Sequence, residues 1–116
     1  MRYYKRELVM AANSTVLKHV RQFFILSFPN TPKQAFTPNR NVRIAFQTET
    51  WKGLADAFNK MAWMKRLGVK ITQGEMGDEN VKTIRDVAEL ITSKAGRKVG
   101  RLSGAEFPRP RPTVLV

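Results

Sequence analysis

The spacing of apolar and polar residues predicts an amphipathic helix over residues 14–28. Its apolar positions recur every three or four residues and cover about a third of the helical wheel. They are Val16, Leu17, Val20, Phe23 and Phe24. Ser14 is placed to cap the start of this helix, and Pro29 accounts for its end because proline disfavours helical backbone in the preceding residue.

Two further amphipathic helices are predicted over 49–67 and 79–94. The apolar face of the first comprises Trp51, Leu54, Ala55, Phe58, Met61 and Ala62. The apolar face of the second comprises Val81, Ile84, Val87, Ala88 and Ile91. Gly68 is placed to end the 49–67 helix. Asp78 is placed to cap the 79–94 helix, Lys94 complements its dipole, and Gly96 follows its end.

Residues 42–47 alternate between apolar and polar positions, as a half-buried strand does. One side comprises Val42, Ile44 and Phe46, and the other comprises Arg43, Ala45 and Gln47. Residues 69–72 are a candidate for a second short strand. The stretch 29–41 has three prolines, three asparagines and no period, which predicts a loop. The expected fold class is therefore α+β and mainly helical.

The two ends of the chain show no clear period. Residues 1–12 do not place their apolar side chains on one face, and periodicity stops after residue 96. The stretch 107–112 is typical of polyproline II, and 113–116 has the composition of an added edge strand. We therefore divide the chain into a basic N-terminal extension that includes a helix (1–40), a compact neutral body (41–96) and a basic Pro- and Arg-rich tail (97–116).

The net charge of +12 is concentrated in the two ends of the sequence. Residues 1–48 carry eight Lys and Arg against one acid, 49–93 carry seven of each sign, and 94–116 carry six against one. The net charges of these segments are therefore +7, 0 and +5. Cationic arms of this kind favour a polyanionic partner, because they otherwise repel themselves.

The sequence offers little support for enzymatic chemistry. The single histidine, His19, lies at the edge of the apolar face of the 14–28 helix, with no evident partner for acid–base catalysis. The carboxylates of 49–93 share solvent-facing positions with Lys and Arg or cap a helix, so they do not suggest a metal site. There is no glycine-rich phosphate loop. We expect neither an enzyme nor a cofactor.

The chain contains no cysteine, which fits a reducing compartment. It has no apolar run long enough to cross a bilayer and no secretory signal. We therefore expect an intracellular protein, in the cytoplasm or an organelle matrix.

The Lys and Arg side chains predict a diffuse nucleic-acid-binding surface, since phosphate neutralisation requires cations. Trp63 is a further candidate, because a continuous helix places its indole on the polar side, where it can stack on a base. Packing of that indole against protein is the favoured alternative. The candidate residues are Lys18, Arg21, Arg40, Arg43, Lys60, Trp63, Arg66, Lys94, Arg97, Lys98, Arg101, Arg109 and Arg111.

The strand-then-helix passage 42–67, followed by Ile84 and Arg85 in another helix, resembles ribbon-helix-helix DNA-binding proteins. The resemblance covers about half of the chain. It implies a dimer in which paired strands enter the major groove, with Arg43, Ala45 and Gln47 facing the bases. The chain departs from that family over 69–78, where about ten residues separate the helices and the family has a tight turn.

These observations predict a non-catalytic basic protein that binds RNA or DNA through its arms, as a small component of a larger, ribosome-like nucleoprotein assembly. One alternative is a structural subunit that contacts other proteins in a multi-protein or membrane-associated complex. Another is a dimeric DNA-binding regulator of the ribbon-helix-helix kind. Other protein subunits are expected partners, and a membrane surface is a weaker candidate.

Overall fold

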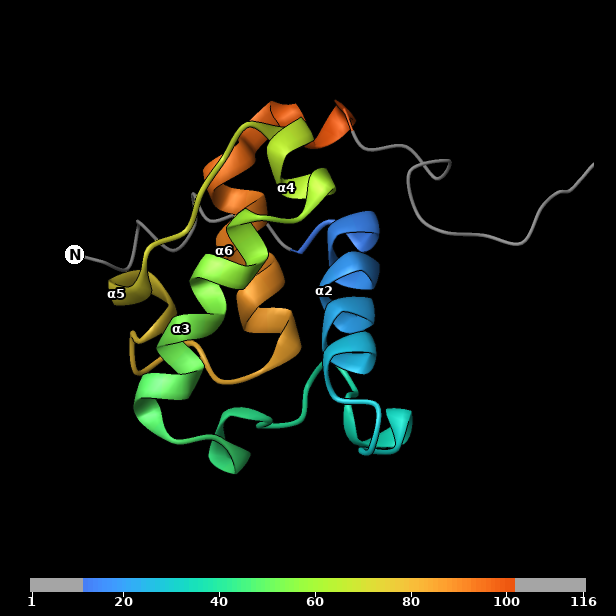
Figure 1. Cartoon of the computed structure of the whole chain (residues 1–116). Helices are drawn as coiled ribbons and strands as arrows, with labels where there is room; N and C mark the ends of the chain where they lie inside the picture. The colour runs from blue at the N-terminus through green and yellow to red at the C-terminus, as the bar shows by residue number, and fades with distance from the viewer. Residues whose placement is uncertain (1–11, 102–116) are drawn as a thin grey trace, which may run out of the picture.

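The computed structural model describes residues 12–101, and this part of the chain is mostly helical (Figure 1). The α-helices are α2 (Ser14–Ser27), α3 (Thr48–Asn59), α4 (Ala62–Leu67), α5 (Gln73–Met76) and α6 (Ile84–Ala95). Three 3₁₀ helices join or extend them, namely η1 (Lys33–Ala35), η2 (Arg43–Ala45) and η3 (Gly96–Arg101). The mainly helical prediction is confirmed. The predicted segments 1–11 and 102–116, with Arg109 and Arg111, lie outside the described residues.

The core lies between α2, α3 and α6, and α4, α5 and the loops close it (Figure 1). Phe24 of α2 and the α3 residues Trp51 and Phe58 are fully buried, and their rings contact one another. The Trp51 indole N–H donates to the carbonyl of Met76 at 2.8 Å, which satisfies a polar group that burial would otherwise penalise. One core thus draws on residues from both sides of position 40.

The helix predicted over 14–28 is present as α2, but its cap is Asn13 and not Ser14. The Asn13 side chain accepts hydrogen bonds from the backbone N–H groups of Thr15 and Val16. The Asn13 N–H in turn donates to the Thr92 hydroxyl at 3.1 Å. This bond fixes the start of α2 against the last turns of α6.

The helix predicted over 79–94 begins five residues later, at Ile84. Thr83 and Asp86 form a reciprocal capping box there, in which each side chain accepts from the backbone N–H of the other, so Thr83 takes the capping position that was expected for Asp78. The Asp78 side chain instead accepts from the N–H of Asn80, within the loop before α6. Gly96 follows the helix as predicted and has φ 57.

The helix predicted over 49–67 is divided into α3 and α4. The Asn59 side chain donates to the carbonyl of Ile71 and accepts from its N–H, at 2.8 and 2.9 Å. Met61 has extended backbone, so the α4 face is rotated relative to the α3 face. This rotation turns Trp63 inward, to 7% exposure, contrary to its predicted position on a polar face.

The strand predicted over 42–47 is the 3₁₀ helix η2 with its flanking residues. The Lys82 carbonyl accepts from the N–H groups of both Val42 and Arg43, at 3.1 Å each, which holds a turn and not an extended ladder. Val42 is buried, whereas Ile44 is 82% exposed. The candidate strand over 69–72 is irregular. Within residues 12–101, β-structure is confined to an isolated bridge between Asn41 and Thr83.

Candidate nucleic-acid interface

Arg21 and Arg43, both predicted to contact nucleic acid, hold loops of the protein itself. The Arg21 guanidinium donates to the carbonyls of Phe36 and Lys33, at 2.8 and 3.2 Å. This places the loop after α2 against the helix. Because two N–H groups of Arg21 are occupied in this way, its first role is structural.

The Arg43 guanidinium binds the loop between α5 and α6. It donates to the carbonyls of Asp78, Val81 and Gly77, at 2.7, 3.1 and 3.1 Å. It also lies over the Trp51 ring, 5.8 Å from the centroid, in a cation–π contact. The position that the ribbon-helix-helix resemblance directs toward bases is therefore turned into the protein. The strand ribbon of that family is absent from the described residues.

Lys94 is paired with Glu75. Its ammonium group lies 2.7 and 2.8 Å from the two carboxylate oxygens, so α5 is tied to the last turn of α6. This hydrogen bond holds the pKa of Glu75 below its ordinary value of 4.5; burial of the carboxylate opposes the shift, and the hydrogen bond from the Thr72 N–H supports it. Lys94 thus neutralises an acidic residue of its own chain.

Trp63 does not offer its face to a nucleobase. Its indole is stacked on the imidazole of His19, with centroids 4.9 Å apart and planes at 15°. The edge of Phe58 closes another side, at 6.3 Å. The indole therefore packs against protein, and the predicted base-stacking role has no exposed ring to carry it.

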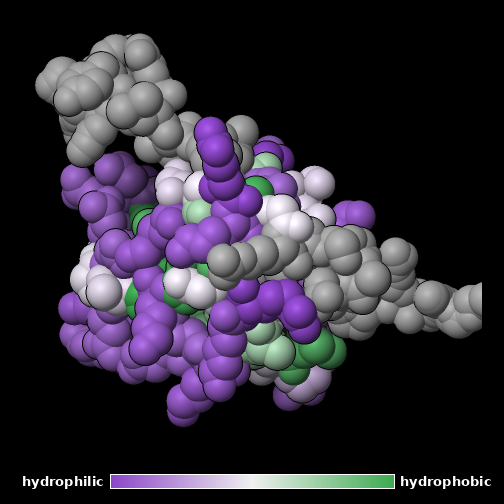
Figure 2. Space-filling view, turned by 90° about the horizontal axis from the view of Figure 1, so that it is seen from above, coloured by the Kyte–Doolittle hydropathy of each residue, from purple (hydrophilic) through white to green (hydrophobic). Residues whose placement is uncertain are grey.

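Five cationic residues lie on or next to α4 and on η3, two elements that pack together, and we call this part of the molecule the basic end. They are Lys60, Lys65, Lys70, Arg97 and Lys98. All except Lys98, which is half-buried, are exposed. Figure 2 views the molecule from this side and shows hydrophilic residues over most of the described surface. The structure thus unites bases from the predicted neutral body with bases from the predicted tail.

Lys60, Lys65 and Lys70 line an open groove of about 710 Å³ beside the turn between α3 and α4. Asp56 lies at its edge, and its carboxylate accepts from the Gln73 amide at 2.9 Å. A groove that collects three ammonium groups suits an extended chain of phosphates more than a single small anion.

Residues 49–93 have a net charge of zero because a basic segment, 57–74, lies between two acidic segments, 49–56 and 75–89. Residues 57–74 contain four bases and no acid, whereas 75–89 contain five acids and two bases. Sequence reasoning missed Lys65 and Lys70 because it averaged these segments. The acid-free run 57–74 was the signal that could have found them.

The other predicted residues lie away from the groove or are not described. Lys18 is exposed on α2, and Arg40 is exposed in the loop beyond the other end of that helix. Arg66 lies on α4 and lines a different hollow, described below. Arg101 ends η3, and its side chain lies outside the described residues.

Comparison with known protein families, curated proteins and solved structures gives no match to this chain. Among residues 12–101, no group of three or more His, Asp or Glu side chains is arranged to hold a metal ion. In the same range, no helix has the length and apolar character that a membrane span requires.

Proposed function

We propose that this protein is a non-catalytic nucleic-acid-binding protein that acts within a larger nucleoprotein assembly. The observation that supports this proposal is the groove that Lys60, Lys65 and Lys70 line, beside the helix α4 that packs against η3 with its Arg97 and Lys98. These residues come from two segments, 57–74 and 90–101, neither of which contains an acid. The carboxylate that lines the groove, Asp56, accepts a hydrogen bond from the Gln73 amide.

Phosphate neutralisation is the interaction that this surface suits. Each Lys or Arg that pairs with a phosphate releases a condensed counterion, which makes binding strongly dependent on salt. Exposed Lys60, Lys65, Lys70 and Arg97 need no rearrangement of the core to make such contacts. The buried Trp63 leaves charge, and not base stacking, as the main source of affinity, so we expect weak sequence preference.

The arrangement of the chain supports a place in an assembly. The described chain starts beside Thr92, through the Asn13 bond, and ends in η3, so both extensions join the body near the basic end. These extensions add Arg2, Lys5, Arg6, Arg109 and Arg111 against Glu7 and Glu106. A body whose cationic surface lies near the residues where both basic extensions begin can be held against a polyanion from that side.

The test is a salt series with the full-length chain and fluorescein-labelled oligonucleotides of single-stranded RNA, single-stranded DNA and duplex DNA. Fluorescence anisotropy between about 50 and 200 mM salt gives the slope of log K against log salt. We expect a slope of about −3 to −5, since each phosphate contact contributes about −0.7 to −0.9. No binding at the lowest salt, or a flat slope, contradicts the proposal.

The basic end is tested by the double variant Lys65→Glu/Lys70→Glu. The matched control is Lys33→Glu/Lys82→Glu, which changes the net charge equally at exposed positions outside the basic end. We expect the first variant to flatten the slope by about 1.5 to 2, two phosphate contacts, and the second to change it by less than half as much. Equal effects of both pairs would show that net charge, and not this surface, determines binding.

The alternative of a protein-contacting subunit is favoured by one observation. Leu26 and Ile44 are the large apolar side chains that remain exposed among the described residues, at 64% and 82%. Each lines a different hollow, Leu26 one beside α4 and Ile44 one beside the loop after α2. Contact with other proteins is compatible with nucleic-acid binding inside one assembly.

A further inference from the structure

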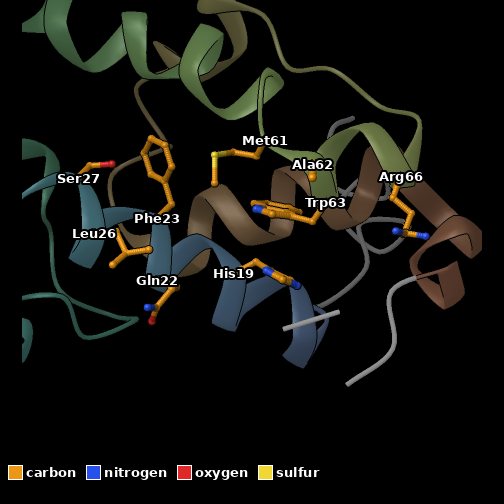
Figure 3. Close-up of a pocket in the computed structure, with 9 residues that line it drawn as sticks. All are labelled: His19, Gln22, Phe23, Leu26, Ser27, Met61, Ala62, Trp63 and Arg66. Carbon is orange, nitrogen blue, oxygen red and sulfur yellow. The ribbon is translucent and has the colours of Figure 1, made fainter. Parts of the chain in front are cut away.

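A groove separates α2 from the start of α4, on a surface distinct from the basic end (Figure 3). Its volume is about 290 Å³. One wall is a single face of α2, formed by His19, Gln22, Phe23, Leu26 and Ser27. The other wall comprises Met61, Ala62, Trp63 and Arg66. Figure 3 shows Leu26 and Ser27 toward one end of the groove and Arg66 toward the other.

The groove is lined mainly by carbon, and its accessible part is aliphatic. Leu26 is 64% exposed at the rim, Ala62 is exposed, and Met61 is half-buried. Trp63 and His19 are stacked on each other and are only 7% and 5% exposed, so neither offers an open aromatic face to a nucleobase. These properties favour an apolar side chain as the occupant over a base.

The size of the groove points to an anchoring side chain and not to a complete small ligand. Pockets that enclose drug-sized ligands usually measure about 300–1,000 Å³, and this open groove lies just under that range. A helix that presents one or two leucines fits such a site, because recognition of an amphipathic helix uses apolar anchors in a shallow trough between helices.

The charges around the groove indicate which charged residues the occupant carries beside its apolar anchors. Neither α2 nor α4 contains an acidic residue. Exposed Lys18 lies on α2, and exposed Arg66 lies on α4 and lines the groove. A partner segment that brings carboxylates to this rim is attracted, whereas a basic segment is repelled.

We infer that the groove between α2 and α4 binds an acidic amphipathic helix of a partner protein, with leucine-type anchors beside Leu26 and carboxylates toward Lys18 and Arg66. This site gives the protein a second interaction surface beside the basic end. It does not depend on nucleic-acid binding, because its anchors are apolar and lie outside the lysine groove.

The experiment uses the full-length chain and a labelled synthetic helical peptide with leucines at positions i, i+3, i+4 and i+7 and glutamates on its other faces. Two control peptides replace the glutamates with lysines or the leucines with serines. We expect saturable anisotropy changes with the acidic leucine peptide and at least tenfold weaker binding of both controls. The Trp63 indole N–H resonance is expected to shift with the first peptide alone.

The variant Leu26→Asp places a carboxylate at the rim, and Ile44→Asp makes the same change at the other exposed apolar residue. We expect Leu26→Asp to weaken peptide binding at least tenfold and Ile44→Asp to leave it within twofold. Both residues are exposed, so both variants should keep the wild-type circular dichroism spectrum.

Equal affinity of the wild-type chain and Leu26→Asp overturns the inference, as does equal binding of the lysine peptide. A shift of the Trp63 resonance by a uridine oligonucleotide, lost in Leu26→Asp, would also overturn it, because the groove would then take nucleic acid. Salt-dependent binding of nucleic acid that is lost in Lys65→Glu/Lys70→Glu bears on the basic end alone, so the two proposals can fail separately.

Discussion

The imidazole of His19 stacks on the indole of Trp63, with ring centroids 4.9 Å apart. His19 belongs to α2 and Trp63 to α4, so this contact joins two helices that are far apart in the sequence. Both side chains are buried, at 5% and 7% exposure. The pair joins the two walls of the apolar groove, since His19 belongs to one wall and Trp63 to the other.

We predict that Trp63→Ala destabilises the protein by about 3–5 kcal/mol, because truncation of a buried aromatic ring leaves a cavity. Chemical unfolding followed by circular dichroism measures the change. Trp63→Phe retains a ring and should lose less than half as much. If Trp63→Ala keeps its stability but loses affinity for RNA, the indole contacts nucleic acid and not His19.

A second prediction concerns Arg43, whose guanidinium serves three backbone carbonyls of the 77–81 loop. Arg43→Ala should lower the free energy of unfolding by about 1–3 kcal/mol, since partly buried acceptors lose their donors. Arg40→Ala is the control for loss of one nearby charge, and we expect less than about 0.5 kcal/mol there. A larger effect of Arg43→Ala on nucleic-acid affinity than on stability would restore the predicted interface role.

The helices could be predicted because the information that forms them is local. In α2 and α6 the apolar spacing alone identifies the buried face, and the structure agrees to within a few residues. The break between α3 and α4 is different. It rests on the bonds between Asn59 and the backbone of Ile71, twelve positions away, and no pattern around Asn59 announces them.

The alternation of apolar and polar residues over 42–47 illustrates a second limit of prediction from the sequence. Val42 and Phe46 do turn toward the core while Ile44 does not, so the period alone cannot identify a strand. A strand at 42–47 would need a neighbouring strand to accept its hydrogen bonds. In the structure the N–H groups of Val42 and Arg43 both donate to the Lys82 carbonyl instead. A short apolar alternation therefore predicts which residues are buried better than it predicts the backbone conformation.

The sequence predicted the kind of partner that the candidate site would bind, but it did not predict where on the molecule the site would lie. The excess of Lys and Arg indicates a polyanion, and that inference uses composition alone. Tertiary contacts determine which cations are available to bind a phosphate. Lys94 is paired with Glu75, and the guanidinium groups of Arg21 and Arg43 donate to loop carbonyls. The meeting of α4 with η3, which creates the basic end, is likewise a long-range property.

The third prediction concerns two glycines, whose replacement by alanine should change the stability in opposite directions. Gly53 lies inside α3 and an added Cβ would meet nothing within 4 Å, so Gly53→Ala should stabilise the protein by about 0.5–1 kcal/mol. Gly96 has φ 57, a conformation that residues with a Cβ rarely adopt, so Gly96→Ala should destabilise it by about 1 kcal/mol or more. Thermal unfolding measures both changes. A rise in Tm for Gly96→Ala would mean that α6 ends elsewhere.

The last prediction concerns the pH dependence that the Glu75–Lys94 pair creates. The pKa of Glu75 is lowered by the hydrogen bond from Lys94, so the folded state favours the ionised carboxylate. This contribution is present above pH 4.5, the ordinary value, and is lost as the pH falls through the lowered pKa. We expect about 0.5–1 kcal/mol, because solvent screens a pair at the surface. Glu75→Gln should therefore be less stable than the wild-type chain at pH 7, and the difference should close in acid.

Glu89 is the matched control, since its pKa is shifted the other way. Burial raises the pKa of Glu89 and the Asp86 carboxylate adds to the rise, partly offset by Arg85. Its ionised form is thus disfavoured in the folded state, so its contribution is greatest below the ordinary value of 4.5 and is lost as the pH rises through the raised pKa. Glu89→Gln should raise Tm at pH 7 while Glu75→Gln lowers it. If both variants move Tm in the same direction at pH 7, loss of a negative charge from a basic protein explains the result, and the Lys94 pair does not.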